Sequence, residues 1–432
     1  MALTAAEQYL LELINRARLD PAAEAKRLSI NLNDSLAPGS IDASSKQVLA
    51  SNALLETAAI AHSQWMLAAD VFSHTGANGS TPAGRAKAAG YNWNLVGENI
   101  AMQGSSGKLD AGKAIAAEHD GLMRSAGHRL NLMNEGFREV GIAQELGVFT
   151  QAGQNYNASM VAEVFGRSAN TVFVTGVAYN DKNKDGFYSI GEAQAGVTLS
   201  VAGQSTKTQT AGGYALGVVA SDVAHISGTV GKLSFTADLF HVTDNVKLDV
   251  VNGNTLYSSA SISLGTGINS VKLLGIDNLQ ATGNASANTI TGGNGNNLLQ
   301  GLAGNDKIYG GAGADRLLGG DGNDSLSGDA GRDWLDGGAG KDLLTGGLDA
   351  DVFVFTKGSS ADIVADFKLS QGDSLQLDDA LWNNRDLSAA QVVAQYAHVE
   401  KGAVLFDFGG GQSLKLTGVT SLSGLADHID FI

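Results

Sequence analysis

The chain of 432 residues contains no cysteine and only three prolines, Pro21, Pro38 and Pro82. Disulfides therefore cannot cross-link it, and an exported protein of this composition needs another kind of staple, such as bound metal ions. No apolar run approaches the ~20 residues of a membrane-spanning helix. The first twenty residues, MALTAAEQYLLELINRARLD, lack the basic stretch followed by an apolar stretch that is typical of a cleaved secretory signal.

Basic residues are also scarce. The chain has 28 Lys and Arg against 44 Asp and Glu, a net charge of −16. Residues 1–168 carry 13 basic against 16 acidic residues, net −3, which leaves 15 against 28, net −13, for residues 169–432. This acidity argues against nucleic acid and anionic membranes as partners and in favour of cations.

Eight consecutive nine-residue units repeat one pattern from Gly283 to Val354. Every unit begins with glycine and has an apolar eighth residue, so stacked units would bury a continuous stripe. Glycine permits positive φ and brings bare carbonyls close to a ligand, and Ca²⁺ takes six to eight oxygens from carbonyls and carboxylates. The oxygen-bearing sixth residues are Asn288 and Asn297, followed by Asp306, Asp315, Asp324, Asp333, Asp342 and Asp351.

These units are similar to the G-G-x-G-x-D-x-U-x nonapeptides of RTX proteins, which form a parallel β-roll with calcium between its turns. In that family two units make one coil. The resemblance therefore pairs Asp306 with Asp324, Asp315 with Asp333, Asp324 with Asp342, and Asp333 with Asp351, and it adds Asn297 as a ligand. The alternative is a disordered Gly/Asp-rich linker, which would have no reason to keep the eighth residue apolar.

The first 70 residues have a helical pattern. Thr4 and Glu7 fit a capping box, and a second helix is expected from about Gln47 to Ala69. Five short phrases follow one another along this part of the chain: Asn15-Arg16-Ala17-Arg18, Phe72-Ser73-His74-Thr75, Gly97-Glu98-Asn99-Ile100, Ser125-Ala126-Gly127-His128-Arg129 and Phe137-Arg138-Glu139-Val140-Gly141.

In this order, over about residues 4–166, the phrases resemble the CAP superfamily (cysteine-rich secretory, antigen 5 and pathogenesis-related proteins) in its bacterial, cysteine-free form. The resemblance implies an α/β/α sandwich with a cleft of two histidines and two acidic residues. These are His74, His128, Glu98 and, in place of the second acid, Ser125. Such a set could hold Zn²⁺ and a water molecule. A general base is missing unless Glu118 or His119 supplies it, and the family has no general enzymatic activity, so we expect binding rather than catalysis.

Alternating apolar residues from Thr171 onward indicate short antiparallel strands. The loop between them has the spacing of a twelve-residue EF-hand loop, with Gly186 at the sharp turn. Because it links strands, the segment is similar to the calcium-binding B-type repeats of bacterial surface adhesins. A solvated turn is the alternative. The candidate calcium ligands are Asp181, Asn183, Asp185, Phe187 through its carbonyl, Ser189 and Glu192.

We therefore expect a multidomain chain. Its parts are a CAP domain at 1–168, a small calcium-binding β-sandwich at 169–236, lead-in strands at 237–282, the parallel β-roll at 283–354, and a β-rich cap at 355–432. The tail Asp430-Phe431-Ile432 is similar to the uncleaved C-terminal signals of type I export substrates.

The combination indicates an extracellular protein, secreted by a type I ABC transporter without a cleaved N-terminal signal. Calcium would fold the roll outside the cell, and the CAP cleft would bind an extracellular lipid, glycan or peptide. Two alternatives stay open. One is a metal-dependent hydrolase that uses the same cleft, and the other is a calcium-dependent adhesin or surface-layer component.

Overall fold

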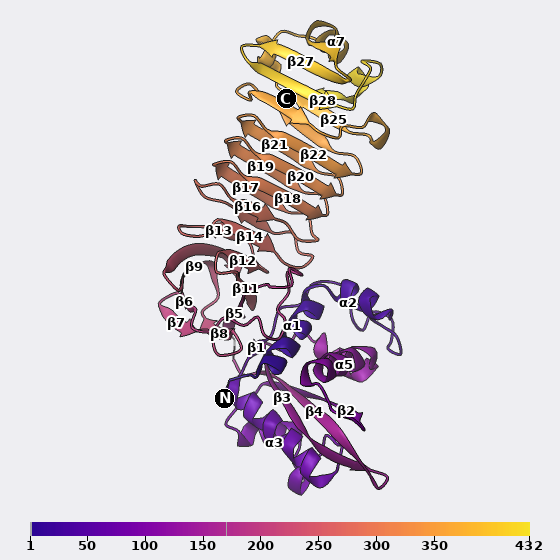
Figure 1. The fold of residues 1–432 in the computed structure, drawn as a ribbon, viewed down its shortest axis with the longest axis vertical. Helices are drawn as coiled ribbons and strands as arrows, with labels where there is room; N and C mark the ends of the chain where they lie inside the picture. The colour runs from indigo at the N-terminus through magenta and orange to yellow at the C-terminus, as the bar shows by residue number, and fades with distance from the viewer. Residues whose placement is uncertain (1, 170) are drawn as a thin grey trace. The chain divides into compact units, whose positions relative to one another are not determined.

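The computed structural model describes residues 2–169 and 171–432 (Figure 1). The chain divides into two compact units. One runs to Ser234 and includes Phe240–Gly253, and the other consists of Phe235–Leu239 and Asn254–Ile432. Within the described residues, no helix has the length and apolar character needed to cross a membrane.

The first part of the chain is the expected α/β/α sandwich. Its central sheet has the strand order β1-β3-β4-β2. Strand β4 alternates between two cores, because Val161 and Phe165 pack on one side with α1 and α5, while Met160, Ala162 and Val164 pack on the other with α3. The elements are α1 (Ala5–Leu19), α2 (Pro21–Leu28), β1 (Ala50–Ser51), α3 (Ala53–Ala69), the 3-10 turn η1 (Ala77–Gly79), α4 (Pro82–Ala88), β2 (Leu95–Ser105), α5 (Ala111–Arg124), α6 (Ala126–Leu132), β3 (Glu139–Gln151) and β4 (Gln154–Arg167).

The helical prediction for the first 70 residues is partly wrong. The capping box at Thr4 and Glu7 is present, but the second long helix begins at Ala53 rather than at about Gln47. Its N-cap is Asn52, whose side chain accepts hydrogen bonds from two backbone N–H groups of the first turn. The residues just before it form β1, which pairs in parallel with β3, so their apolar side chains are buried by the sheet.

The next strands complete the first unit. β5 pairs antiparallel with β8, and β6 pairs antiparallel with β7 and β9, as expected. β11, which falls in the stretch where lead-in strands were expected, pairs in parallel with β5 and lies within the first compact unit. The strands are β5 (Val172–Tyr179), β6 (Thr198–Val201), β7 (Gln204–Lys207), β8 (Gly213–Val218), β9 (Ser221–Val230) and β11 (Val246–Val251).

The repeat region is a parallel β-roll, which confirms the predicted fold. Successive nine-residue repeats alternate between two sheets, and the strands of repeats two apart pair in parallel. For example, Ile308 of β18 lies opposite Leu326 of β20 (Figure 1). The apolar eighth residues form the core and are at most 1% exposed. One sheet contains β12 (Thr255–Ser258), β14 (Ser270–Leu273), β16 (Thr289–Thr291), β18 (Lys307–Ala312), β20 (Ser325–Ala330) and β22 (Leu343–Leu348). The other contains part of β10 (Leu233–Val242), then β13 (Ile262–Leu264), β15 (Gln280–Thr282), β17 (Leu298–Ala303), β19 (Arg316–Asp321), β21 (Trp334–Ala339) and β23 (Val352–Phe355).

The roll continues beyond the nonapeptides. β24 pairs in parallel with β22, β25 with β23, and β29 with β25. The cap also contains a helix, α7, that the sequence analysis did not predict. These elements are β24 (Ala361–Val364), η2 (Leu369–Gln371), β25 (Ser374–Leu377), η3 (Asp379–Trp382), α7 (Ala389–Tyr396), β26 (Ala397–Glu400), β27 (Ala403–Gly409), β28 (Gln412–Thr417), η4 (Leu425–His428) and β29 (Ile429–Phe431).

Candidate functional site

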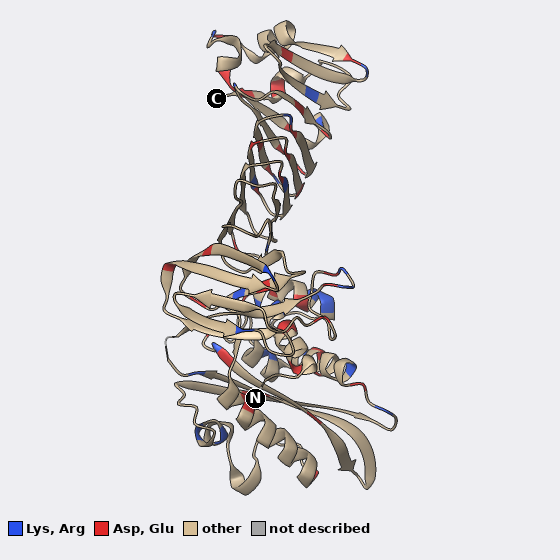
Figure 2. Cartoon of the chain, turned by 60° about the vertical axis from the view of Figure 1, so that its left-hand side comes forward, with Lys and Arg blue, Asp and Glu red and all other residues tan. Residues whose placement is uncertain are grey.

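The aspartates at the sixth repeat position form two ladders, one along each edge of the roll. In each ladder the backbone N–H of one aspartate donates to Oδ1 of the aspartate two units later, as from Asp306 to Asp324 at 2.8 Å and from Asp315 to Asp333 at 2.8 Å. Acidic residues accordingly recur along the loops of the roll in Figure 2. Each carboxylate thus has one oxygen that is used by the protein.

The second oxygen of these carboxylates has no partner. Oδ2 is buried without a hydrogen bond in all six repeat aspartates. A buried carboxylate oxygen without a partner costs considerable free energy unless a cation or a proton compensates it. The aspartates are Asp306, Asp315, Asp324, Asp333, Asp342 and Asp351.

A backbone carbonyl shares the space that this oxygen faces. A methyl group added at Gly301 would lie 2.2 Å from Asp306 Oδ2 and 2.6 Å from the carbonyl oxygen of Gly319. Equivalent pairs of oxygens lie 2.3 to 2.7 Å from the same point at Gly310, Gly319 and Gly328. Each of these four places, here called cradles, therefore has no room for a side chain and brings together a carboxylate oxygen and a carbonyl oxygen, the two kinds of ligand that calcium takes.

Asparagine at the same repeat position behaves differently. Asn297 Oδ1 accepts from the N–H of Gly293 at 2.7 Å, and its Nδ2 donates to the Asp277 carbonyl at 3.3 Å. Asn288 also uses both ends of its amide within the protein. Both asparagine side chains therefore have hydrogen-bond partners at their oxygen and at their nitrogen, unlike the carboxylates, and the ligand role of Asn297 stays a prediction.

Burial opposes ionisation of the aspartates when no cation is present. It raises the pKa of Asp315 and Asp324 to about 6 and that of Asp333 and Asp351 to about 7, and other nearby aspartates, inside and outside the ladder, add repulsion. A bound divalent cation would remove both penalties. The buried, unpartnered oxygens thus give the ladder the chemistry that a cation would compensate.

The loop expected to resemble an EF-hand brings most of its candidate ligands together. Asn183 donates to Asp185 at 2.9 Å and to Ser189 at 3.3 Å, while Glu192 accepts from backbone N–H groups of the loop. Asp181 Oδ2 accepts from Gly186, and its Oδ1 is buried without a partner. The Phe187 ring packs 6.1 Å from Tyr9 and 5.0 Å from the Arg16 guanidinium, both of helix α1.

The four cleft residues expected from the CAP resemblance lie in two hydrogen-bonded pairs. His74, from the loop after α3, donates through Nδ1 to Glu98 of β2 at 2.9 Å. His128 of α6 bonds through Nδ1 to the Ser125 hydroxyl at 2.8 Å. The two imidazole centroids are 6.4 Å apart, and His74 is half exposed. Burial, and secondarily His74, lowers the pKa of His128, so its imidazole is neutral near pH 7.

Both carboxylate oxygens of Glu98 already have partners within the protein. Oε1 contacts His74, and Oε2 pairs with the Arg85 guanidinium. Across residues 2–169 and 171–432, no group of three or more histidine, cysteine, aspartate or glutamate side chains is arranged to hold a metal ion. The zinc ion that the resemblance allowed therefore has no support. The roll cradles are a different kind of site, because each combines one carboxylate with a backbone carbonyl oxygen.

Neither of the two general bases considered from the sequence reaches the cleft. Glu118 is buried against Ser159, whose hydroxyl donates to it at 3.0 Å. His119 is fully buried and lies 3.1 Å from Glu24 of α2. Glu118 therefore faces the sheet, where Ser159 lies in β4, and His119 faces α2.

The sequence analysis missed the residues that hold the cleft in place. Asn99 donates to the His128 carbonyl at 3.3 Å and to buried Glu163 at 3.0 Å. Asn131 donates to the Glu98 carbonyl at 3.1 Å. His62 is buried, with its Nε2 3.8 Å from Glu98. Only Asn99 lay in a recognised phrase, and the others are distant in sequence.

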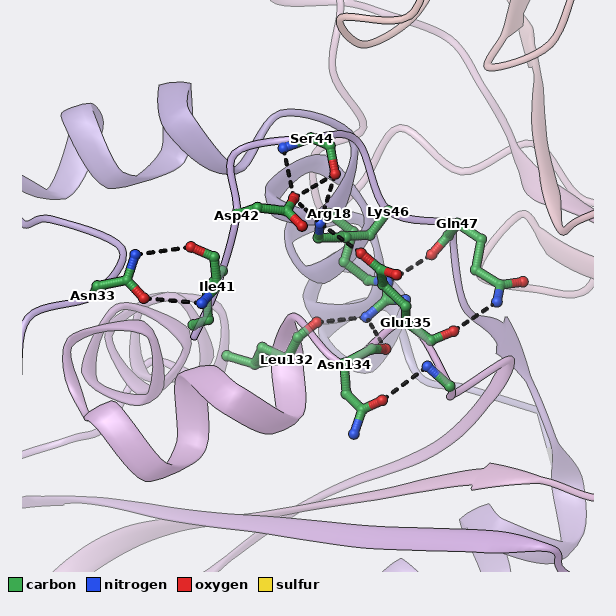
Figure 3. Close-up of polar contacts among 11 residues, drawn as sticks. Arg18, Asn33, Ile41, Asp42, Ser44, Lys46, Gln47, Leu132, Asn134 and Glu135 are labelled. Carbon is green, nitrogen blue, oxygen red and sulfur yellow. Dashed lines mark hydrogen bonds and ion pairs between the residues drawn. The ribbon is translucent and has the colours of Figure 1, made fainter. Parts of the chain in front are cut away.

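A buried arginine fixes the chain that follows α6. Arg18 Nη1 donates to the Leu132 carbonyl at 2.6 Å, and its Nε donates to the Gln47 carbonyl at 2.7 Å (Figure 3). Lys46 pairs nearby with Glu135 at 2.8 Å and with Asp42. A cavity of about 530 Å³ borders these loops. Arg18 therefore anchors the end of the helix that carries His128.

Buried Glu163 predicts a pH-dependent stability. Burial raises its pKa to about 8, so the folded domain keeps a proton that the unfolded chain releases near pH 4.5. This contribution is complete below pH 4.5 and is lost as pH rises towards 8, at about 1.4 kcal/mol per pH unit. The stability advantage of Glu163→Gln over the native chain should therefore grow between pH 5 and pH 8, as measured by urea unfolding of the helical signal. Equal growth for Glu145→Gln, a partly exposed position, would refute burial as the cause.

Comparisons with known proteins identify a family for the N-terminal domain and for the repeat region. Residues 11–147 match the cysteine-rich secretory protein family, and residues 282–317 and 318–353 match the RTX calcium-binding nonapeptide repeat. Comparison with curated proteins gave no match.

Three solved structures are similar to part of the chain. An extracellular protein with an SCP domain from Bacillus anthracis is 24% identical over 38% of this chain and 40% of its own, with a TM-score of 0.24. An outer surface protein from Borrelia burgdorferi is 17% identical over 35% of this chain and 96% of its own, with a TM-score of 0.22. An extracellular lipase from Serratia marcescens is 16% identical over 38% of this chain and 40% of its own, with a TM-score of 0.20. This chain thus spans well under two thirds of the Bacillus protein.

The α/β/α sandwich, with His74 and His128 in one cleft, and the roll with its aspartate ladders agree with the two family matches. The chain carries a domain of the cysteine-rich secretory protein (CAP) family at residues 11–147 and RTX calcium-binding repeats at residues 282–353.

Proposed function

We propose that this chain is a secreted protein whose roll folds when it binds calcium outside the cell and whose CAP domain binds an extracellular ligand. The main support for calcium binding by the roll is the row of buried, unpartnered Oδ2 atoms in the repeat aspartates. Extracellular calcium modules have dissociation constants of roughly 10⁻⁴–10⁻³ M, so the ladder would be filled outside the cell and empty inside it.

The export route follows from the same property. A roll that stays unfolded at low calcium can pass through a type I ABC transporter as an extended chain, and the repeats resemble those of that export class. The tail at Asp430–Ile432 would act as the uncleaved signal. Expression beside such a transporter, with and without the last residues, tests this route by the amount of protein in the medium.

The cleft chemistry suits a ligand that carries hydroxyl or amide groups. Neutral imidazoles such as His128 offer one donor and one acceptor each, and Ser125 adds a hydroxyl. Phe72, two residues before His74 in the chain, is 46% exposed, so its ring is available to contact an apolar part of a ligand. A glycan or a peptide fits this mixture better than a lipid, which would leave the polar groups unpaired.

The proposed cleft predicts a specific loss of binding. Replacing His128 with Ala removes a donor and an acceptor from the cleft, so affinity for a captured glycan or peptide should fall about 10-fold, which corresponds to one or two lost hydrogen bonds. Binding to immobilised glycan and peptide panels measures it. Gln154→Ala, on the distant hairpin between β3 and β4, is the control. Equal binding by the native chain and His128→Ala would refute the cleft, and capture only by lipid vesicles would refute the ligand class.

We also propose a calcium ion at the Asp181–Glu192 loop. The unpartnered Asp181 Oδ1 supports it, and the contact of Phe187 with Arg16 and Tyr9 would pass the stabilisation to helix α1. The loop would then be a structural tie within the first compact unit and not a regulatory switch.

A further inference from the structure

The hydrogen-bond ladder does not stop at the last nonapeptide. The Asp342 N–H donates to Asp362 Oδ1 at 3.0 Å, in the same way that the Asp324 N–H donates to Asp342 Oδ1 at 2.8 Å. The spacing along the chain increases from 18 to 20 residues at this step. Asp362 therefore occupies the ladder position of a further coil, outside residues 282–353 that match the repeat family.

Asp362 has the property that distinguishes the repeat aspartates from the asparagines. It is 2% exposed, and its Oδ2 is buried without a hydrogen-bond partner. Asp342, directly before it in the ladder, is also 2% exposed and has an unpartnered Oδ2. By contrast, Asn288 and Asn297 satisfy both ends of their side chains within the protein. Two adjacent buried carboxylates with free oxygens need a cation or a proton to compensate them, and one divalent cation can serve both.

The opposite edge of the roll ends differently. Asp373 accepts the Asp351 N–H through Oδ1 at 3.1 Å, but its Oδ2 accepts the Lys368 N–H at 2.8 Å. Asp366 closes this edge by accepting the N–H groups of Gly346 and Gly347. The protein itself satisfies the terminal carboxylates on this side, so the argument applies only to the edge that contains Asp362.

We propose that a calcium ion binds between Asp342 and Asp362, one coil beyond the nonapeptide array. This inference rests on the proposed calcium binding of the array and extends it. Asp362 lies in β24, which pairs with β22 of the array on one side and with β28 of the cap on the other. The ion therefore ties the array to the C-terminal cap, and its occupancy controls whether the last coil docks.

Counting bound calcium ions tests the proposal. The full chain, Asp362→Asn and Asp386→Asn are titrated with calcium and counted by native mass spectrometry and isothermal titration calorimetry. Asp362→Asn keeps an acceptor for the Asp342 N–H, so it should fold and bind one ion fewer than the native chain. Asp386 is exposed in the cap, and its substitution should leave the count unchanged.

The outcomes separate this site from the array. If Asp362→Asn binds as many ions as the native chain, the two carboxylates are held by protons and the proposal is wrong. If the native chain binds no calcium, the proposed function itself fails. Asp324→Asn, inside the array, should lose an ion whether or not the Asp362 site exists. Should Asp362→Asn not fold at saturating calcium by circular dichroism, Asp362→Ser is counted in its place.

Discussion

Removing calcium with a chelator is expected to unfold residues 283–354 while the CAP domain stays folded. Each ion stabilises the fold by about 1.4 kcal/mol when free calcium is about ten times its dissociation constant. The four cradles of one carboxylate and one carbonyl each, at Gly301, Gly310, Gly319 and Gly328, then contribute about 6 kcal/mol together. That is comparable with the whole free energy of unfolding of an ordinary domain.

Hydrogen exchange measured by mass spectrometry resolves this effect along the chain. In calcium, amides of the roll strands should be protected. In chelator they should exchange like an unfolded chain, while amides of β3 and β4 keep their protection. Magnesium should not replace calcium, because it demands near-octahedral geometry and gives up its water reluctantly. Protection of residues 283–354 that survives chelation would contradict the proposed role of the ladder.

Replacing Gly319 with Ala is expected to remove a calcium ion through a single methyl group. The added Cβ would lie 2.4 Å from Asp324 Oδ2 and 2.4 Å from the Gly337 carbonyl oxygen, in the space that the two oxygens face. Gly319 does not have a positive φ, so backbone strain does not contribute. The lost ion and the crowding of a backbone carbonyl should together destabilise the roll by about 2 to 4 kcal/mol.

The measurement is the calcium concentration at the midpoint of folding, followed by circular dichroism. Gly319→Ala should raise it several-fold. Gly121→Ala, in helix α5, is the matched control, because nothing lies within 4 Å of its added Cβ. An unchanged midpoint for Gly319→Ala would mean that the space is not used by an ion.

The roll could be predicted because the nine-residue period of its sequence corresponds directly to the repeat of its structure. An apolar residue at the eighth position of every nine-residue unit, such as Leu317 or Leu326, must face inward, and glycines at the turns allow only a short coil. The extension of the ladder was harder to predict. Asp362 and Asp373 each stand two residues before an apolar core residue, as in the repeats, but the intervening spacing is irregular, and neither has the glycines that stand five residues before every repeat aspartate and two residues before most of them.

The cleft could be predicted only as a list of residues. The phrases that contain His74, Glu98 and His128 marked these residues as candidates. No local pattern indicated that Arg85 would form an ion pair with Glu98, or that His119 would be buried in contact with Glu24. These pairings join segments that are distant in sequence, so they depend on how the helices pack against the sheet. The start of α3 was misplaced for the same reason, since Ala50 and Ser51 form a strand only because β3 lies beside them.

The sequence by itself determined that this protein carries stacked coils with an aspartate at a fixed position and has no disulfides, because repeat period, glycine placement and cysteine content are local properties. Its short phrases added the resemblance to the CAP family. Only the tertiary structure decided which carboxylate oxygens remain unpartnered. That distinction separates Asp362 from Asp373 and from both asparagines, and it arises from the hydrogen bonds that neighbouring coils do or do not supply. A free buried oxygen is a property of three-dimensional surroundings, and no pattern along the chain reports it.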